Sequence, residues 1–431
     1  MQSLHIKSVS NRFFFLLLYI GLAMTGFNPM SSKILFISMM SVLCMLIVKS
    51  YKKKNICLFV AFVYMLPYTT VLYYILWGTN VQLSFYTQFN TQRAFFDSSM
   101  IFFLFLSSLN FFLKIPLGTG NFSCYKGNDF LFCLGIVGCL YAIIRGKSGD
   151  VNVFLNGEYT PDFSRSSLFE YFFVFYLISF VFSKNSKKYK YILYFIAFFY
   201  VGKNTIFGGR IESLMCVLFL LAIDLQKKIK FNTLLIFLAS GYVLMFLLGV
   251  IRAYGFSWDL ILNGLFSKGN GIITTQESDV NYASVRILEM VRLNIITTSQ
   301  RFESLGLFFE SLFLPKDSLP QLVDLSTYEQ SSYPCGGGGL ISAFAFVFLG
   351  YIGVIGIAFF VAKIFSNGVA NKSLFKNLFF ILTYTTMPRW FAYYPITLFK
   401  LALLGSTITW ILIIIYDSYA KNKSFYSRTR L

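Results

Sequence analysis

Long apolar runs recur along almost the whole chain, and they constrain its fold more than any other feature. Runs of this length can cross the hydrocarbon core of a bilayer as helices. We count twelve, some of them short or interrupted. They lie at residues 12–28, 33–48, 56–77, 98–115, 129–145, 167–183, 189–202, 211–226, 231–251, 339–363, 376–387 and 393–416. The sequence therefore predicts an all-α polytopic membrane protein with about twelve transmembrane helices.

The composition excludes a soluble globule, because 56% of the 431 residues are hydrophobic and only 13% are charged. A formal net charge of +19 is also found in proteins that bind nucleic acid. Here, however, the lysines stand in short clusters between apolar runs, where they set topology and contact anionic lipid headgroups. We therefore expect membrane lipids as partners, and no nucleic acid.

Basic residues mark every second connector between the runs. With a cytoplasmic N-terminus, the segments on the inside hold 22 of the 37 lysines and arginines, and the other 15 are spread over all outside segments. This asymmetry follows the positive-inside rule. We therefore expect a multi-pass protein with both termini in the cytoplasm.

Residues 252–338 form the one long stretch without a membrane-length apolar run. They separate an N-terminal bundle of about nine spans, 1–251, from a C-terminal bundle of about three spans with a basic cytoplasmic tail, 339–431. The stretch holds nine of the 18 acidic residues and, in the predicted topology, faces outward. A loop of this length indicates a function rather than a simple connection.

Within this loop, residues 284–314 repeat apolar side chains at helical spacing. Arg286, Glu289 and Arg292 recur three residues apart on the opposite face. The pattern predicts one or two short interfacial helices that lie along the outer membrane surface.

Three arginines lie at the outer ends of predicted spans. Arg210 opens the eighth span, Arg252 ends the ninth, and Arg389 lies in the turn between the eleventh and the twelfth. Lys203 and Lys400 are further candidates for this group. A charge at this depth is costly unless it is solvated, paired or facing a polar cavity, so each marks a candidate site. The alternative is a long basic side chain that reaches the surface from a helix end.

Three of the four tryptophans fall near the outer interface in this topology. They are Trp77, Trp258 and Trp390. An indole at this depth lies half in lipid and half in water, so interfacial anchoring is the first interpretation. Stacking of sugar rings on the exposed aromatic faces is the alternative.

Glycines are concentrated at the start of the tenth predicted span. The run at 336–339, which includes Gly337 and Gly338, lets backbone come close to a ligand or to a neighbouring helix. Further along, glycines recur every third residue from 350 to 356, a spacing that predicts a flat strip for close helix packing.

These residue types suit a lipid substrate with an anionic headgroup. Arginine presents a planar fork to phosphate oxygens, and stabilising a diphosphate leaving group would lower the barrier for glycosyl transfer. Because His5 is expected in the cytoplasm, a general base on the outside must be a carboxylate, and Glu289 and Asp279 are the candidates. Glu277 and Asp279 also have the spacing of a metal-binding pair, which is more typical of a solvated loop.

The order of these features resembles the bacterial O-antigen or oligosaccharide repeat-unit polymerase (Wzy) family. The resemblance rests on Gly-Gly-Arg-Ile-Glu-Ser-Leu at 208–214, Arg252, the outward loop and the glycine-rich sequence at 337–353, and it covers mainly residues 200–400. It implies a C-type glycosyltransferase of the bacterial inner membrane that works on the periplasmic face. Such an enzyme moves a growing glycan from one undecaprenyl diphosphate carrier onto a new lipid-linked repeat unit.

The resemblance also assigns roles to the candidate residues. Arg210, Arg252 and Arg389 would hold the diphosphates, with Glu289 as the base. The other expected contacts to substrate are Lys203, Arg286, Arg292, Gly337, Gly338, Trp258, Trp390 and Lys400. Undecaprenyl-diphosphate-linked oligosaccharide would be both donor and acceptor, without a nucleotide sugar, cofactor or metal. A chain-length regulator protein and a flippase are further partners that the resemblance implies.

Three alternative functions stay open. An O-antigen ligase uses the same donor with lipid A core as the acceptor, but the ligases we compare carry an outside histidine. A flippase for lipid-linked oligosaccharide would have short loops and charges near mid-membrane, which this chain does not show. A non-enzymatic scaffold is the third.

Overall fold

The computed structural model of the chain is built from helices. It describes residues 2–69, 88–89, 91–118, 122, 126–146, 167–184, 186–207, 209–254, 276–336, 338–368 and 373–428. No strand occurs among these residues. The predicted all-α class is therefore confirmed for the described part of the chain.

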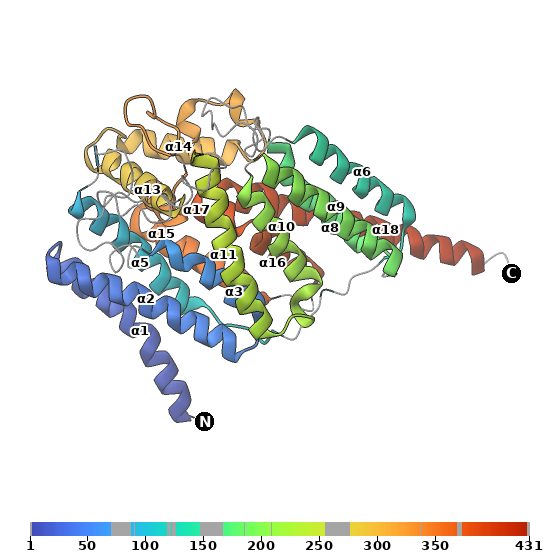
Figure 1. Ribbon diagram of the computed structural model, residues 1–431, viewed down its shortest axis with the longest axis horizontal. Helices are drawn as coiled ribbons and strands as arrows, with labels where there is room; N and C mark the ends of the chain where they lie inside the picture. Colours follow the sequence, from blue (N-terminus) through green and yellow to red (C-terminus); the bar gives the residue numbers. More distant parts are fainter. Residues whose placement is uncertain are drawn as a thin grey trace. The chain divides into compact units, whose positions relative to one another are not determined.

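The first of two compact units contains most of the long loop. It comprises residues 1–119, 267–368 and 387–397. Its helices are α1 (Gln2–Thr25), α2 (Pro29–Lys52), α3 (Ile56–Met65) with the 3-10 turn η1 (Leu66–Tyr68), α5 (Gln92–Phe112), α13 (Gln276–Arg292), α14 (Thr298–Glu310), α15 (Ile341–Asn367) and α17 (Met387–Ala392). α1, α2 and α5 pack on one another, and α5 also lies against α15 and α13 (Figure 1).

The second unit comprises residues 120–266, 369–386 and 398–431. Its helices are η2 (Ser167–Tyr171), α6 (Asp129–Arg145), α8 (Phe172–Phe182), α9 (Lys187–Ile206), α10 (Arg210–Ile223), α11 (Phe231–Tyr254), α16 (Leu374–Thr385), the π-helix η6 (Leu398–Leu404) and α18 (Gly405–Arg428). Figure 1 shows α6, α8 and α9 side by side. The two units do not coincide with the three consecutive stretches predicted from the sequence, 1–251, 252–338 and 339–431. Each unit combines parts of all three, because loop residues from 276 onward pack with α5 and α15.

Several helices begin at a polar residue that the sequence places just before an apolar run. The side chains of Asn28, Asn55, Thr91 and Asn128 each accept a hydrogen bond from the backbone N–H three residues further on. An N-cap of this kind satisfies a donor that the first helical turn leaves without a partner, and it contributes about 1 kcal/mol. The caps thus fix where α2, α3, α5 and α6 start.

Four helices are long and apolar enough to cross a membrane. They are Pro29–Lys52, Gln92–Phe112, Ile341–Asn367 and Leu398–Lys421. Shorter apolar helices lie at Phe13–Thr25, Ile56–Tyr68, Leu168–Phe182 and Phe231–Leu244. Each of the twelve predicted runs falls on a helix, except for residues 70–77, which lie outside the described residues. The architecture is compatible with a helical membrane protein, and the count of twelve crossings stays a prediction.

The loop contains two helices, α13 and α14, in the region where helical spacing was recognised. α13 begins at Gln276, eight residues before the predicted start, so it includes Glu277 and Asp279 in its first turn. The prediction of an exposed polar face is wrong, and the position of the helix relative to the membrane stays a prediction. Every side chain from Asn281 to Met290 is buried, including those of the expected polar face.

α15 is broken in the middle, at Leu349 and Gly350, where the backbone leaves helical geometry. Gly350 has φ +63, which a residue with a side chain adopts only at a cost. At Gly353 a Cβ would lie 2.2 Å from the Ala345 carbonyl oxygen across the break. A Cβ at Gly356 would meet nothing within 4 Å. The predicted strip for helix packing is therefore wrong, because Gly350 and Gly353 lie at a kink within α15 instead of facing a neighbouring helix.

Candidate functional site

The short helix α17 places Arg389 inside the first unit. Arg389 is 9% exposed, and its guanidinium carbon lies 5.6 Å from the centre of the Tyr393 ring. The Tyr393 N–H donates to the Arg389 carbonyl at 3.0 Å, so both residues belong to one turn. A cation at this distance from an aromatic ring is within cation–π range. The alternative of a basic side chain that extends to the surface does not fit this position.

Trp390, the next residue, is fully buried at 0% exposure. Its indole packs against the rings of Phe365 and Phe391, with centroids 6.4 and 6.3 Å away. A side chain in this environment can neither anchor the protein at the interface nor stack on a sugar. Both interpretations of Trp390 are wrong, because the turn that carries it packs inward.

The glycine run lies directly against this turn. Gly338 has φ +91, and a Cβ there would lie 3.1 Å from Cδ1 of Tyr393. The Gly339 N–H donates to the Ala392 carbonyl at 3.3 Å. The run thus allows the close backbone approach to a neighbouring helix that glycine permits. Gly337 lies outside the described residues.

Two carboxylates come to the same place from the first turn of α13. A Cβ at Gly336 would lie 3.1 Å from Cβ of Asp279, so Asp279 packs against the start of the glycine run whose Gly338 contacts the turn after α17. Glu277 and Asp279 are both half-buried. Negative charge in the first turn of a helix is stabilised by the helix dipole. The first turn of α13 therefore places Asp279 against the glycine run and Glu277 within electrostatic range of Tyr64.

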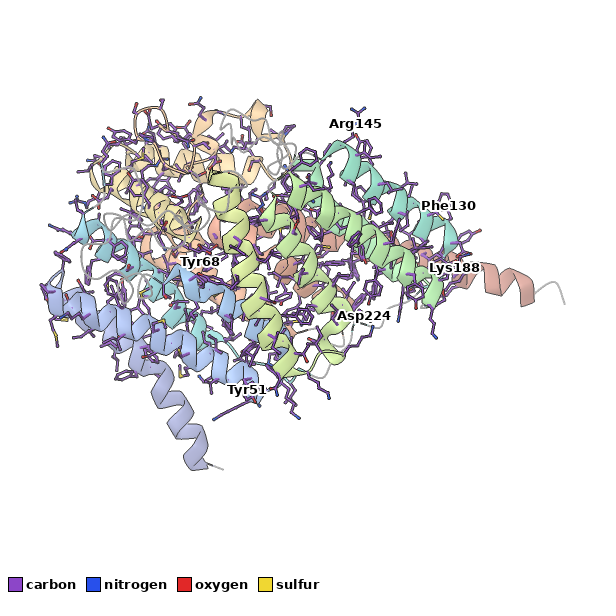
Figure 2. The ribbon with its side chains drawn as sticks, in the orientation of Figure 1. Tyr51, Tyr68, Phe130, Arg145, Lys188 and Asp224 are labelled. Atoms are coloured by element: carbon purple, nitrogen blue, oxygen red, sulfur yellow. The ribbon has the colours of Figure 1, made fainter. Side chains whose placement is uncertain are left out.

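A pair of tyrosines completes the arrangement. The hydroxyls of Tyr64 and Tyr68 are 2.8 Å apart, and Tyr64 lies within electrostatic range of Tyr393, Glu277 and Arg389. Figure 2 shows Tyr68 at the end of α3, whose 3-10 turn contacts α13. We call the following residues the Arg389 cluster: Tyr64, Tyr68, Glu277, Asp279, Arg389 and Tyr393.

The tyrosines of this cluster were not among the residues singled out from the sequence. A usable signal was present, since Tyr64 and Tyr68 are four residues apart and so share one face of a helix. They also flank Pro67, in the middle of the third predicted span. The contact with Tyr393 joins segments more than 300 residues apart in the chain, and no local pattern reports it.

Glu289 does not belong to the Arg389 cluster. It is twelve residues after Glu277 on α13, which corresponds to about 18 Å along a helix. Its carboxylate is bound by Arg292, with Nε–Oε distances of 3.0 and 2.9 Å and an Nη2–Oε2 distance of 2.6 Å. This hydrogen bonding raises the pKa of the Arg292 guanidinium above its usual value. Of the two carboxylates considered as a base, Asp279 is the one that lies against the glycine run.

Arg286 is entirely buried at the centre of α13. Its guanidinium donates to four backbone carbonyls of the chain that follows α14, those of Leu325, Ser326, Tyr328 and Tyr333. A guanidinium surrounded in this way holds a segment of chain in place. The expected contact between Arg286 and substrate does not fit this position.

The remaining candidates belong to the second unit. The ammonium of Lys203 donates to the carbonyls of Ile143 and Gly146, so it caps the C-terminal end of α6. Arg210 is the first residue of α10 and is half-buried. Arg252 lies in the last turn of α11, and its side chain is outside the described residues. Lys400 lies in η6, within electrostatic range of Glu170.

The predicted convergence of three arginines therefore stays a prediction, and Trp77 and Trp258 fall outside the described residues. No family model matches the chain, and no curated protein or solved structure matches it either. What the first unit does bring together is one guanidinium, two carboxylates and three phenols around a glycine backbone. Such a group can bind an anion at the guanidinium and accept a proton at a carboxylate.

Proposed function

We propose that this chain is a polymerase that joins undecaprenyl-diphosphate-linked oligosaccharide repeat units into a surface polysaccharide such as O-antigen. It would act on the periplasmic face of the bacterial inner membrane. The observation that carries the proposal has two parts. Asp279 lies against the glycine run that packs on the turn after α17, and Glu277 and Arg389 both lie within electrostatic range of Tyr64. The apolar helices supply the setting that a lipid-linked substrate requires.

In the proposed reaction, a hydroxyl of the incoming repeat unit attacks the anomeric carbon of the growing glycan. The bond between that carbon and the diphosphate oxygen breaks, and the diphosphate leaves with the electron pair. Arg389 stabilises the negative charge that develops on it. Asp279 or Glu277 accepts the proton of the attacking hydroxyl. Atoms and charge balance without a metal or nucleotide.

The two alternatives with similar substrates are less well supported. A flippase binds the diphosphate without breaking a bond, so it has no use for carboxylates beside the guanidinium. A ligase shares the donor chemistry, and it is separated from a polymerase by the product. Arg210 and Arg252 lie in the second unit, and their expected role in holding the diphosphates rests on the sequence alone. Their alanine variants are therefore tested in the polysaccharide assay described next.

The test is a gel of surface polysaccharide from a deletion strain complemented with variants. We expect the deletion to leave a single repeat unit on the lipid core, and Arg389→Ala to do the same. Loss of one contact to a developing charge typically lowers the rate about 100- to 1,000-fold. Asp279→Asn and Glu277→Gln should shorten the ladder according to which of them accepts the proton.

The matched control is Arg145→Ala, at the exposed end of α6 (Figure 2). It removes an arginine without touching the Arg389 cluster, so the full ladder should persist. A full ladder in Arg389→Ala, at equal protein amount in the membrane, would overturn the assignment. Complete absence of surface glycan in the deletion strain would instead favour the ligase or the flippase.

Sidedness is tested separately with single cysteines in a chain without its native cysteines. Glu303 on α14 and Lys188 on α9 are both exposed. The proposal places Glu303→Cys outside and Lys188→Cys in the cytoplasm. A membrane-impermeant maleimide should therefore label the first in intact cells and the second only after lysis. The reverse pattern would exclude a periplasmic site.

A further inference from the structure

A small cavity lies beside the Arg389 cluster within the first unit. Its volume is about 10 Å³, which leaves room for a single water molecule. The polar side chains in its lining are Tyr68 of the cluster, Asn281 of α13, and Ser98 and Ser99 of α5. All four side chains are buried. The cavity therefore suits one small polar molecule that stays inside the protein, and it has no room for part of a larger ligand.

Asn281 supplies a donor that a water molecule in this cavity would satisfy. It is 4% exposed, and among the described residues its Nδ2 has no hydrogen-bond partner. An unpaired buried donor costs the free energy of its lost hydration. Buried waters typically satisfy such groups and make about three hydrogen bonds each, which the Asn281 amide and the three hydroxyls of the lining can provide. The size and the polar groups of the cavity thus match one ordered water.

The two tyrosines of the cluster connect this cavity to the helix that carries Arg389. Their hydroxyls are 2.8 Å apart. Tyr68 is buried and lines the cavity, whereas Tyr64 is half-buried. Both rings pack on Phe391 of α17, with centroid distances of 6.2 Å for Tyr64 and 5.3 Å for Tyr68. The hydroxyl pair therefore leads from the cavity to the cluster.

The groups at the two ends of this path give it a direction. At the inner end, the Asn281 N–H can only donate. At the outer end, Tyr64 lies within electrostatic range of Glu277 and Arg389, and a carboxylate or a phosphate bound there can only accept. A hydroxyl or a water does both, so each one between the ends accepts from the group before it and donates to the next. In this order Tyr68 donates to Tyr64, and the Tyr64 proton is left for an acceptor beside Arg389.

We propose that the cavity binds one water that orders Tyr68 and Tyr64 into a directed chain, and that the Tyr64 hydroxyl donates a hydrogen bond to the diphosphate held by Arg389. Tyr64 is then a binding residue for the anionic part of the substrate, and Tyr68 and Asn281 are positioning residues that act through it. This inference rests on the proposed function, which identifies the anion as a diphosphate. A fixed donor at this place also stabilises the charge that develops on the leaving diphosphate.

The test uses the purified full-length protein and inorganic diphosphate as the probe, with binding measured by isothermal titration calorimetry. Tyr64→Phe removes one hydroxyl and keeps the ring. It should weaken binding about tenfold to 100-fold, the loss of one hydrogen bond to a charged group. Asn281→Leu displaces the water, and Tyr68→Phe interrupts the chain while the Tyr64 hydroxyl stays in place. Each of these two should weaken binding about twofold to tenfold, the effect of one neutral hydrogen bond.

A double-mutant cycle tests whether Asn281 acts through Tyr64. Effects of residues that share one chain of hydrogen bonds do not add, whereas those of independent residues do. The variant with both Tyr64→Phe and Asn281→Leu should therefore bind diphosphate as Tyr64→Phe alone does. Additive losses would overturn the directed chain, because Asn281 would then act on binding by another route.

Asn110→Leu is the matched control. Asn110 lies in the same unit, is 1% exposed, and its Nδ2 likewise has no partner among the described residues. It stands about three turns along α5 from Ser99, far from the cavity. Its Oδ1 accepts from Lys49 Nζ at 3.2 Å, so the substitution should lower the melting temperature and leave diphosphate binding unchanged. The control thus separates a loss of stability from a loss of binding.

The outcomes separate this inference from the proposed function. Diphosphate binding that is weakened in Tyr64→Phe and Asn281→Leu, but not in Asn110→Leu, supports the role of Tyr64, even if Arg389→Ala retains a full polysaccharide ladder and so removes the polymerase assignment. Equal binding by the wild type and Tyr64→Phe, or no binding by the wild type, overturns the inference, even if Arg389→Ala abolishes the ladder. A density map of the wild type that resolves ordered water should show one molecule within hydrogen-bond distance of Asn281 Nδ2, and its absence from such a map would also overturn the inference.

Discussion

α13 and α14 follow each other in one loop, and both carry an arginine that donates to backbone carbonyls, yet the chain buries them to different degrees. α14 buries three residues, Ser304, Leu307 and Phe308, and leaves Phe302 and Phe309 more than half exposed. α13 buries every side chain from Asn281 to Met290. The helix that reaches the Arg389 cluster is therefore the one enclosed on all sides.

The difference comes from the chain that follows. Residues 325–333 supply the carbonyls that Arg286 binds, and so cover what would be the polar face of α13. Arg301 of α14 instead donates to Phe346 and Val347, whose carbonyls precede the break in α15. Arg286 therefore fixes the chain segment that covers α13, the helix that reaches the candidate site. Arg301 binds α14 to α15 next to the kink in that helix.

The largest effect is expected from Arg286→Ala. The substitution leaves carbonyls of the 325–333 segment without their donor and opens a void in a packed interior, so the free energy of unfolding should fall on the order of 4 kcal/mol. An SDS titration of the purified protein measures it. Arg145→Ala, an exposed arginine, should stay within about 0.5 kcal/mol of the wild type. Equal values for the two variants would show that α13 is not covered in this way.

Arg301→Ala should have the next largest effect, because it removes two hydrogen bonds from a charged group, whereas Arg286→Ala removes four. We expect a loss of about 2–3 kcal/mol in the same titration. The half-buried position of Arg301 lets water replace part of what is lost. A loss as large as that of Arg286→Ala would mean that α14 is as enclosed as α13, and the comparison between the two helices would fail.

The same contrast explains what the sequence could and could not predict. Apolar runs and polar caps are local, so the helices were predictable. The periodicity in α13 was also visible, but the residues that cover Arg286 lie about 40 positions later, and nothing local announces them. For the site, Arg389, Asp279 and the glycine run were singled out individually. Their meeting depends on contacts across more than 50 residues, which a single sequence does not report.

Gly338→Ala tests the join between α13 and α17. A residue with a Cβ is strained at φ +91, and the new methyl would press on Tyr393 and on the Ala392 carbonyl. We expect a loss of about 1–2 kcal/mol in stability. Surface polysaccharide should fall further than stability does, because the displaced Tyr393 ring lies against Arg389. In Gly356→Ala the Cβ meets nothing within 4 Å, and this variant should be neutral or gain about 0.5–1 kcal/mol.

Phe302→Ser should have the smallest effect on stability, within about 0.5 kcal/mol, because the ring is 59% exposed. Its informative readout is a different one. Phe302, Phe309 and Phe313 are all more than half exposed on or just after α14, an apolar surface that membrane lipid would cover. A spin label at Phe302 should then be quenched by oxygen, which partitions into lipid, rather than by a water-soluble nickel complex. A label at Asn281 should be reached by neither reagent, since that position lies inside α13. If the nickel complex quenches the label at Phe302, then α14 faces water, and the two helices differ in burial but not in their contact with the membrane.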